Sequence, residues 1–418
     1  MRKQLRETWD ILKSFRGNAR ACLLAEPLWG IPFNLYSAYT SVYMLALGCT
    51  QTQVGLVSTV GLACMMLFSL MGGYITDRLG RRRTTIVFDL IGWSVPTLLW
   101  AFARGFPYFL AAAVVNSVYR IVHVSWSCLL VEDSPPEQRV HIYTWVHVAG
   151  ILAGFFSPVA GVLVRRFSLV PAVRGLYLYA FVSMTGMFFL RNHFTHEPSM
   201  GVVKRQETGD LPFAAYLRDY RRIVSELAGN RVILVIFALL VLATIQMTLW
   251  RTFFAILLTQ RLHFPDPSVS LFPAVQSAVM LAVFLFVMPR LVRYDFKASL
   301  FWALLACLAG SVSLILAPQR SYPAVIAGTV LLAAGMAVVN PVVEAMLANA
   351  IPDRDRAVVT SLLFVFLFAF SAPFGYVGGS LSSVDERLPF VLLAGTCVLS
   401  LLLLGLLSTL KKAQSSRP

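Results

Sequence analysis

The stretch Gly73-Tyr74-Ile75-Thr76-Asp77-Arg78-Leu79-Gly80-Arg81-Arg82-Arg83 decides how the rest of the chain is interpreted. Apolar segments of roughly 20 residues or more flank it on both sides, and about 20 apolar residues are enough for a helix to cross a bilayer. The stretch is therefore predicted to be a tight turn between two membrane-spanning helices. Gly80 permits a positive φ in such a turn. The arginines favour the cytoplasmic side, because moving them across a bilayer is costly.

The composition places the whole chain in the membrane class. Of its 418 residues, 58% are hydrophobic and 13% are charged, whereas a soluble domain carries about 25% charged residues. The net charge of +15 does not indicate nucleic acid as a partner, because most lysines and arginines lie in alternate loops, as membrane topology requires. Six cysteines are scattered singly, without metal-ligand spacing. We expect no cofactor, no metal site and no nucleic-acid partner.

We predict twelve membrane-spanning helices, near residues 21–47, 53–76, 84–103, 107–131, 140–163, 171–190, 232–258, 269–289, 298–317, 322–349, 357–380 and 388–409. With both termini in the cytoplasm, most lysines and arginines fall on the inner side, which fixes the predicted orientation. Arg165, Arg166 and Arg174 depart from this rule, since they lie in the outer loop after the fifth span. A solvated loop explains them, as would binding of anionic headgroups or of substrate. Short loops favour a bacterial plasma membrane as the location.

The chain is predicted to divide into two related halves. The expected regions are an amphipathic cytoplasmic segment at 1–20, a six-helix bundle at 21–190, a cytoplasmic linker with an interfacial helix at 191–231, a second six-helix bundle at 232–409 and a cytoplasmic tail at 410–418. An internal repeat supports the division, because the P-x-x-x-R pattern of Pro135 and Arg139 recurs at Pro352 and Arg356.

The pattern G-x-x-x-D-R-x-G-R-R at residues 73–82 resembles the loop between helices 2 and 3 of the major facilitator superfamily of transporters. The resemblance implies an all-helical integral membrane fold of two pseudo-symmetric six-helix bundles, with substrate bound between them near the midplane. It also implies a conformational gate, in which the acid and arginines of this loop meet the end of helix 4 and helix 11. A plain positive-inside turn is the alternative. The expected gate residues are Gly73, Asp77, Arg78, Gly80, Arg81, Arg82, Glu132, Asp133, Arg139 and Arg356.

Polar residues within the spans of the first half are candidates for a substrate or proton pathway, because an unpaired charge in hydrocarbon is costly. In the fourth span, Asn116, Arg120 and His123 share one helix face. Arg120 resembles the helix-4 arginine of proton-linked members, although a valine replaces the glycine usual there. In the first span, Glu26 and Asn34 share a face. We hypothesise that Glu26 pairs with Arg120 in one state and separates when a proton or substrate binds. The alternative is a purely structural pair.

The second half supplies its own candidates, Gln246, Asn340 and Glu344, with Arg251 and Gln276 as further polar residues. Glu344 lies one turn after a proline that frees a backbone carbonyl, and it is the expected second proton site. Abundant aromatic residues in the spans favour an amphipathic or aromatic organic ligand, although lipid-facing rings give the same composition.

Small residues of the fifth span partly resemble the glycine-proline motif of antiporters in this superfamily. These are Gly150, Gly154, Ser157, Pro158 and Gly161, and close helix packing is the alternative reason for them. No motif of an ATPase or other enzyme is present. We therefore expect a monomeric secondary transporter of a small organic solute, with proton-coupled export as the leading mode. Proton-coupled uptake, a lipid flippase and a non-transporting receptor or scaffold are the alternatives.

Overall fold

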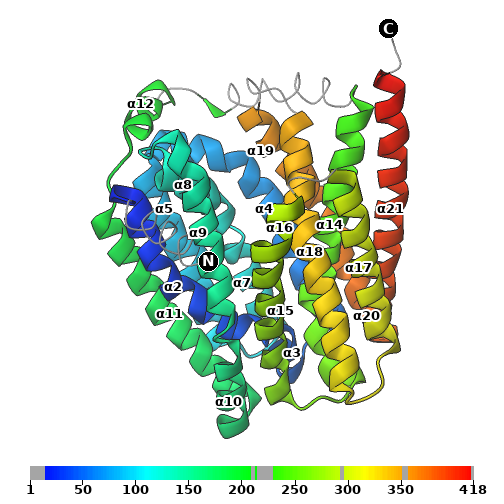
Figure 1. Ribbon diagram of the computed structural model, residues 1–418. Helices are drawn as coiled ribbons and strands as arrows, with labels where there is room; N and C mark the ends of the chain where they lie inside the picture. Colours follow the sequence, from blue (N-terminus) through cyan, green and yellow to red (C-terminus); the bar gives the residue numbers. More distant parts are fainter. Residues whose placement is uncertain (1–14, 209–211, 214–228, 292–295, 351–355, 416–418) are drawn as a thin grey trace, which may run out of the picture.

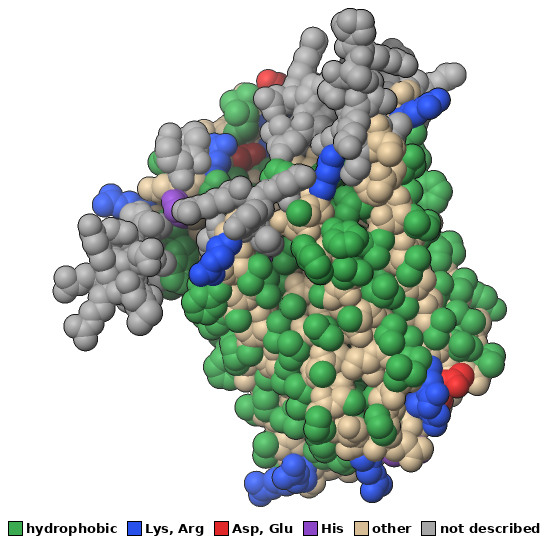
Figure 2. All heavy atoms as spheres, turned by 45° about the vertical axis from the view of Figure 1, so that its right-hand side comes forward, with side chains coloured by type: hydrophobic (Ala, Val, Ile, Leu, Met, Phe, Trp, Pro, Cys, Tyr) green, Lys and Arg blue, Asp and Glu red, His purple; other side chains and the backbone are tan. Residues whose placement is uncertain are grey.

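The computed structural model describes residues 15–208, 212–213, 229–291, 296–350 and 356–415. In this part of the chain, eleven helical segments are long and apolar enough to cross a membrane. Figure 2 shows lysine and arginine side chains gathered toward the two ends of the molecule, with hydrophobic side chains exposed on the surface between them. This distribution is that of a protein whose middle faces lipid rather than water.

Most of the predicted spans are broken into two to four consecutive helical segments. Those of the first half are α2 (Gly17–Ser37) with α3 (Thr40–Ala46), α4 (Gln51–Leu79), α5 (Arg81–Asp89) with the π-helical turn η1 (Leu90–Ser94) and α6 (Val95–Ala101), α7 (Phe106–Asn116) with α8 (Tyr119–Val131), α9 (Pro136–Gly154) with α10 (Ser157–Phe167), and α11 (Leu169–Phe194). The short helix α12 (Ser199–Thr208) follows in the linker.

The second half has the same kind of organisation. Its helices are α14 (Arg231–Ile256) with η2 (Leu257–Arg261), then η3 (Asp266–Ser270), α15 (Leu271–Ala282), η4 (Val283–Val287) and α16 (Met288–Leu291), then α17 (Phe296–Leu316), α18 (Tyr322–Ala350), α19 (Arg356–Ser371) with α20 (Pro373–Val384), and α21 (Leu388–Ser415). The predicted all-helical membrane fold is confirmed, because these segments coincide with the twelve predicted spans.

The first span is the one that the eleven apolar segments leave out. Helix α2 is 21 residues long, but Arg20, Glu26 and Asn34 lower its mean hydropathy. It packs against α11 and α9, with Cys22 and Leu35 buried. This helix therefore places polar groups inside the bundle, as the prediction for Glu26 and Asn34 requires.

The turn predicted for residues 73–83 is much shorter than expected. Helix α4 continues to Leu79 and α5 begins at Arg81, so only Gly80 separates them. Its φ of 89° is one that glycine adopts readily and other residues rarely adopt. The two helices extend beyond the apolar runs, which is why a hydropathy pattern places the turn too broadly.

Other parts of the predicted organisation are corrected or lie outside the described residues. Residues 1–14 of the predicted surface segment lie outside them, as do residues 209–211 and 214–228 of the predicted linker. Phe213 of the linker is described, and its ring centroid is 5.3 Å from that of Tyr74. Helix α21 continues to Ser415, so the predicted tail is helical over most of its length.

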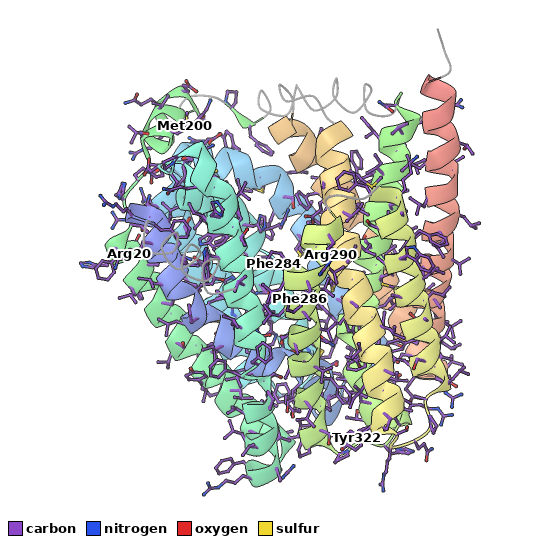
Figure 3. The ribbon with its side chains drawn as sticks, in the orientation of Figure 1. Arg20, Met200, Phe284, Phe286, Arg290 and Tyr322 are labelled. Carbon is purple, nitrogen blue, oxygen red and sulfur yellow. The ribbon has the colours of Figure 1, made fainter. Side chains whose placement is uncertain are left out.

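The two halves lie side by side, and α4 of the first half packs against α19 and α20 of the second (Figure 1). Figure 3 shows Met200 of α12 at one end of the molecule and Tyr322, the first residue of α18, at the other. The end that holds α12 is termed the linker side below, and the other end the opposite side. The linker side is the one predicted to be cytoplasmic.

Candidate functional site

A cavity of about 540 Å³ lies between the two halves. Helices α2, α5, α8, α9 and α11 form its wall in the first half, and the second half contributes Arg251 from α14 and Gln276 and Ser277 from α15. Aromatic rings form much of the surface, with Trp29 stacked on Phe33 at a centroid distance of 4.9 Å and edge-on to Trp93 at 5.0 Å. Such a wall offers flat apolar faces to a ligand.

Three charged side chains of the first half line this cavity, and two of them escaped the sequence analysis. Asp89 and Arg191 form a buried ion pair between α5 and α11. Glu26 of α2 lines the same cavity. Within the described residues, no hydrogen bond or ion pair joins the Glu26 carboxylate to another side chain. Glu26 is therefore an acidic residue of the cavity whose carboxylate has no such partner there. Asp89 is a charged residue inside a predicted span, so it met the criterion by which Glu26 became a candidate. Arg191 lies one residue beyond the predicted end of its span and did not meet that criterion.

The hypothesised pair of Glu26 and Arg120 is not formed in this structure. Arg120 is buried, and its Nε donates to Ser69 Oγ at 3.2 Å. Its guanidinium carbon lies 4.2 Å from the ring centroid of Phe364 and 5.1 Å from that of Phe368. Because Ser69 is on α4 and both rings are on α19, Arg120 joins the first half to the second instead of facing α2.

The other polar candidates of the first half divide between the cavity and its surroundings. Asn34 and His123 both line the cavity, and the Asn34 Nδ2 donates to the Gly30 carbonyl at 2.8 Å. The Asn116 Nδ2 donates to the Gly92 carbonyl at 2.7 Å. Asn116 lines a smaller cavity and is not among the residues that line the central cavity with Glu26.

The predicted candidates of the second half are not among the residues that line the central cavity. Gln246 is fully buried, and its Nε2 lies 3.5 Å from Ser400 Oγ. The Asn340 Nδ2 is 3.4 Å from the Met336 carbonyl oxygen, and the Glu344 side chain is exposed. The faces of α14 and α18 that carry these residues point elsewhere. Arg251 and Gln276, the lesser candidates, line the cavity instead.

The predicted gate contains a compact charge cluster centred on Arg81. The Arg81 Nη1 lies 2.8 Å from Asp77 Oδ1, and its Nε lies 3.2 Å from Glu132 Oε2. Arg81 is only 4% exposed. Of the three predicted gate arginines, Arg78, Arg81 and Arg82, only Arg81 meets Glu132 in the described residues, because the short turn brings this first residue of α5 against the end of α8.

A carboxylate from the connection between α11 and α12 completes this cluster. Glu197 Oε1 accepts from the Arg81 backbone N–H at 2.6 Å, and Oε2 accepts from that of Arg82 at 2.8 Å. A Cβ on Gly80 would lie 3.0 Å from the carboxylate, and one on Gly201 would overlap it. Both glycines therefore leave room for Glu197, which no sequence motif had indicated.

The remaining predicted gate residues have local partners. Arg78 donates to the Tyr74 hydroxyl at 2.8 Å, and Arg82 donates to the Asn192 carbonyl at 2.7 Å. Asp133 lies 3.1 Å from His196 Nε2, and the Arg139 Nε is 3.4 Å from the Ser134 carbonyl. Gly73 lies within α4. Arg356 begins α19, and its side chain lies outside the described part.

The opposite side of the molecule is closed by direct contacts between the halves. Thr52 and Ser383 share a hydrogen bond of 2.9 Å between their hydroxyl oxygens, and Gln51 donates to Glu386 at 3.2 Å. A Cβ on Gly55 of α4 would overlap the Gly375 carbonyl oxygen of α20, so the two backbones touch. By contrast, the contacts of the Arg81 cluster in the described residues stay within the first half and the α11–α12 connection.

Comparisons with known proteins agree with this architecture. A family model described as Major Facilitator Superfamily matches residues 29–320, and no curated protein matches the chain in sequence. The crystal structure of the nucleoside transporter NupG is 15% identical, covers 94% of this chain and 99% of its own, and has a TM-score of 0.70. The D-xylose-proton symporter is 13% identical, covers 92% of this chain and 96% of its own, and has a TM-score of 0.71. A bacterial homolog of the human lysosomal transporter Spinster, in an inward-facing and unoccupied conformation, is 13% identical, covers 94% of this chain and 96% of its own, and has a TM-score of 0.72. At these identities the solved structures show the fold alone, but the family model covers well over half of the sequence, and the chain belongs to the Major Facilitator Superfamily.

Proposed function

We propose that this protein is a secondary transporter that exchanges protons for a small amphipathic or aromatic organic solute and so exports that solute. The observation that supports the proposal is the cavity between the halves, which is lined both by Glu26 and by aromatic rings. Its volume of about 540 Å³ falls in the range of roughly 300–1,000 Å³ that is usual for small-molecule sites.

Glu26 is the proposed proton carrier. Its carboxylate shares the cavity with the Asp89–Arg191 pair, which already neutralises both of its own charges. A charge without a partner in hydrocarbon is costly. Glu26 is therefore favoured as a protonated acid when the cavity is closed and as a carboxylate when water reaches it. Alternating access makes the same side chain take up a proton on one side and release it on the other.

The aromatic residues Trp29, Phe33 and Trp93 are the proposed contacts for the apolar part of the solute. Asn34 and His123 from the first half, with Gln276 from the second, are the proposed hydrogen-bonding groups. Because these residues come from both halves, a bound solute would draw α2 and α15 together. Arg120 is proposed to couple the halves mechanically through Phe364 and Phe368 instead of pairing with Glu26.

The small residues of the fifth span, which resemble the antiporter motif, support the proposed exchange of protons for solute. A Cβ on Gly154 would overlap Ser277 Oγ of α15, and one on Gly161 would overlap the Pro267 carbonyl oxygen of η3. The small residues that resemble the antiporter motif therefore lie at the interface between the halves. They allow the close approach that closes the opposite side, and this interface must separate in each cycle.

Proton-coupled uptake is the second candidate, because the D-xylose-proton symporter has a similar fold and the same acid in the cavity would serve it. A lipid flippase is less well supported, since the cavity is of a size for a small molecule. We also propose that the protein works as a monomer in a bacterial plasma membrane, with the linker side in the cytoplasm. Its cavity is formed within one chain, and its basic residues follow the positive-inside rule.

Purified protein in liposomes that contain a pH-sensitive dye tests the proposal. We expect one compound in a panel of amphipathic cations, sugars, amino acids and lipids to trigger proton movement. An imposed pH gradient then separates the modes. Solute accumulation in liposomes that are acidic inside indicates exchange, whereas accumulation in liposomes that are acidic outside indicates symport and overturns the export mode.

Glu26→Gln tests the proton carrier itself. We expect this variant to lose solute-driven proton movement and to retain exchange of labelled for unlabelled solute, which needs no net proton transfer. Glu344→Gln is the matched control, because Glu344 is exposed and does not line the cavity. If Glu344→Gln uncouples transport and Glu26→Gln does not, the proton site lies in the second half.

A further inference from the structure

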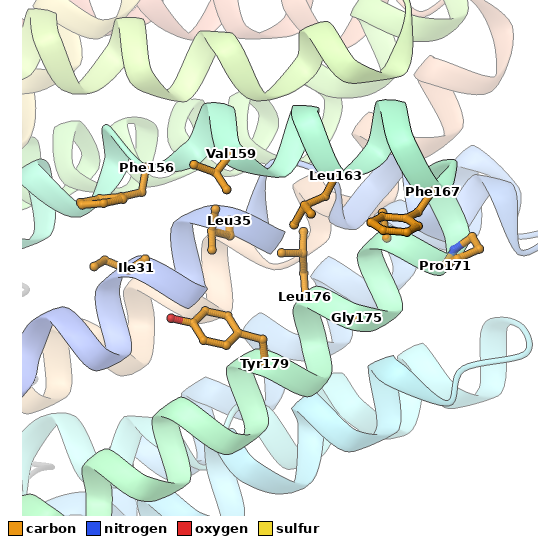
Figure 4. A pocket seen from close by; sticks show the side chains of 11 residues that line it. Ile31, Leu35, Phe156, Val159, Leu163, Phe167, Pro171, Gly175, Leu176 and Tyr179 are labelled. Carbon is orange, nitrogen blue, oxygen red and sulfur yellow. The ribbon is translucent and has the colours of Figure 1, made fainter.

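A second concave surface lies on the outside of the first half, away from the central cavity. It is a groove of about 680 Å³ between α2, α10 and α11. Figure 4 shows side chains of all three helices pointing into it, with Phe156, Val159, Leu163 and Phe167 along one wall. The Tyr179 hydroxyl is the only polar side-chain group in the lining. Several of these residues are exposed, so the groove opens toward the lipid.

The length of the groove matches one leaflet of a bilayer. From Phe156 to Phe167 the chain advances by about 16 Å, at about 1.5 Å per helical residue. The hydrocarbon core of a bilayer is about 30 Å thick, so this distance is close to half of it. The Phe167 end lies where α10 ends, before α11 begins at Leu169. The groove therefore runs from the surface on the opposite side to roughly the middle of the membrane.

A positive charge lies at the surface end of the groove. Arg166 is exposed, and its guanidinium carbon lies 5.5 Å from the ring centroid of Phe167, which lines the groove. Leu163 also lines the groove and precedes Arg166 by three residues, so both share one face of α10. Arg165 adjoins it and is exposed as well. Both arginines occupy the side from which the positive-inside rule excludes them, whereas Arg174 has a structural role, donating to the Ala103 carbonyl at 2.9 Å.

Gly175 of α11 widens the groove. It is exposed, and a Cβ built on it would meet no atom within 4 Å. Neither backbone conformation nor helix packing explains this glycine, because its φ is ordinary and nothing approaches it. The missing side chain leaves open space in the wall that α11 contributes to the groove.

We propose that this groove binds one acyl chain of an anionic phospholipid from the leaflet on the opposite side, with the phosphate of its headgroup on Arg166 and Arg165. The apolar lining accounts for the chain, the length for its position in a single leaflet, and the arginines for the negative headgroup. The site is separate from the central cavity, and it holds lipid whether or not the proposed transport function is correct.

Native mass spectrometry of the purified full-length protein tests the proposal, with phosphatidylglycerol and phosphatidylcholine of equal chain length as probes. We expect the wild-type protein to retain phosphatidylglycerol in preference. Gly175→Leu fills the groove and should lose this lipid. Gly186→Leu is the control, because Gly186 lies on the same helix, is exposed and has equal free space around it, but does not line the groove.

The headgroup contact has its own pair of variants. Arg166→Gln should weaken phosphatidylglycerol binding about fivefold, the effect of one basic residue near an anionic membrane surface, and leave phosphatidylcholine unchanged. Arg104→Gln removes another exposed arginine outside the groove and should change neither. Equal retention of both lipids, or retention that survives Gly175→Leu in protein that still elutes as a folded monomer, overturns the proposal. Displacement of the lipid by a transported solute would also overturn it, by assigning the groove to that solute.

Discussion

At the start of α5, three consecutive arginines occupy the position that least suits them. The first turn of a helix exposes backbone N–H groups and carries the positive end of the macrodipole, so it favours acidic residues. Glu197 resolves this conflict from outside the helix. Its two oxygens accept from the N–H groups of Arg81 and Arg82 at 2.6 and 2.8 Å. The linker thus supplies the cap that the sequence of α5 lacks.

Glu197→Gln is expected to loosen this helix start. The amide keeps the shape of the carboxylate but removes its charge and turns an N–H donor toward other donors. We expect a loss of about 1 kcal/mol, the usual worth of a cap, and hence roughly fivefold faster hydrogen exchange at Arg81 and Arg82. Hydrogen–deuterium exchange measures it. Glu207→Gln, which removes an exposed carboxylate 2.8 Å from Lys204, should leave α5 unchanged, and an equal effect of both variants would refute the capping role.

The sequence predicted the positions and partners of individual side chains less well than it predicted the helices. The rule that intramembrane charges are functional candidates led to Glu26 and His123, which line the cavity, but also to Glu344, which does not. Helical periodicity shows which residues share a face, but not which way that face points. Asp89 met the same rule and was overlooked beside the arginine-rich turn. Pairings between distant helices, such as Asp89 with Arg191, have no local pattern from which to predict them.

Among the helices, α4 and α20 bring the backbones of the two halves into direct contact. Gly55 faces Gly375 and Gly379, and a Cβ on Gly55 would overlap the Gly375 carbonyl oxygen. Backbones that approach this closely pack over a wide surface, and small residues make that approach possible in membranes. This contact therefore belongs to the conformation in which the opposite side is closed.

Gly55→Ala should shift the molecule away from that conformation. Overpacking a tight contact costs about 1–3 kcal/mol, enough to change a two-state population by about 5- to 150-fold. A cysteine at Thr52, labelled by a membrane-impermeant maleimide, reports the opening as faster labelling. Gly61→Ala on the same helix is the control, because its Cβ would meet only Ala113 Cβ, at 4.0 Å. Unchanged labelling in Gly55→Ala would mean that this contact does not hold the side closed.

The elements themselves were predictable, because bilayer thickness fixes the length of an apolar run and the twelve runs are long. Their ends were less predictable, since α4, α5 and α21 continue beyond the apolar residues. Gly80, which the sequence analysis named, does mark an end, through its φ of 89°. A residue that must adopt a positive φ marks the end of a helix, whereas a hydropathy pattern does not show where the helix ends.

For the whole molecule, the two sides are held by different kinds of contact. Contacts across the halves close the opposite side, through Thr52 with Ser383 and Gln51 with Glu386. On the linker side, the Arg81 cluster connects parts of the first half with one another. The first half and its linker connection can therefore move as one body while the contacts with α20 break. The division of the chain at residues 190 and 232 stays a prediction that this motion would test.

A cross-link between the halves on the opposite side should stop transport. Thr52→Cys with Ser383→Cys replaces two hydroxyl groups that lie 2.9 Å apart. Oxidation, or a short bifunctional thiol reagent, would then hold the closed side shut. We expect solute exchange in liposomes to fall to the background rate and to recover on reduction. Each single cysteine variant, treated in the same way, should keep its activity, as should the wild-type protein with its own six cysteines. Full activity in the cross-linked protein would show that this interface does not open during transport, and alternating access about it would be wrong.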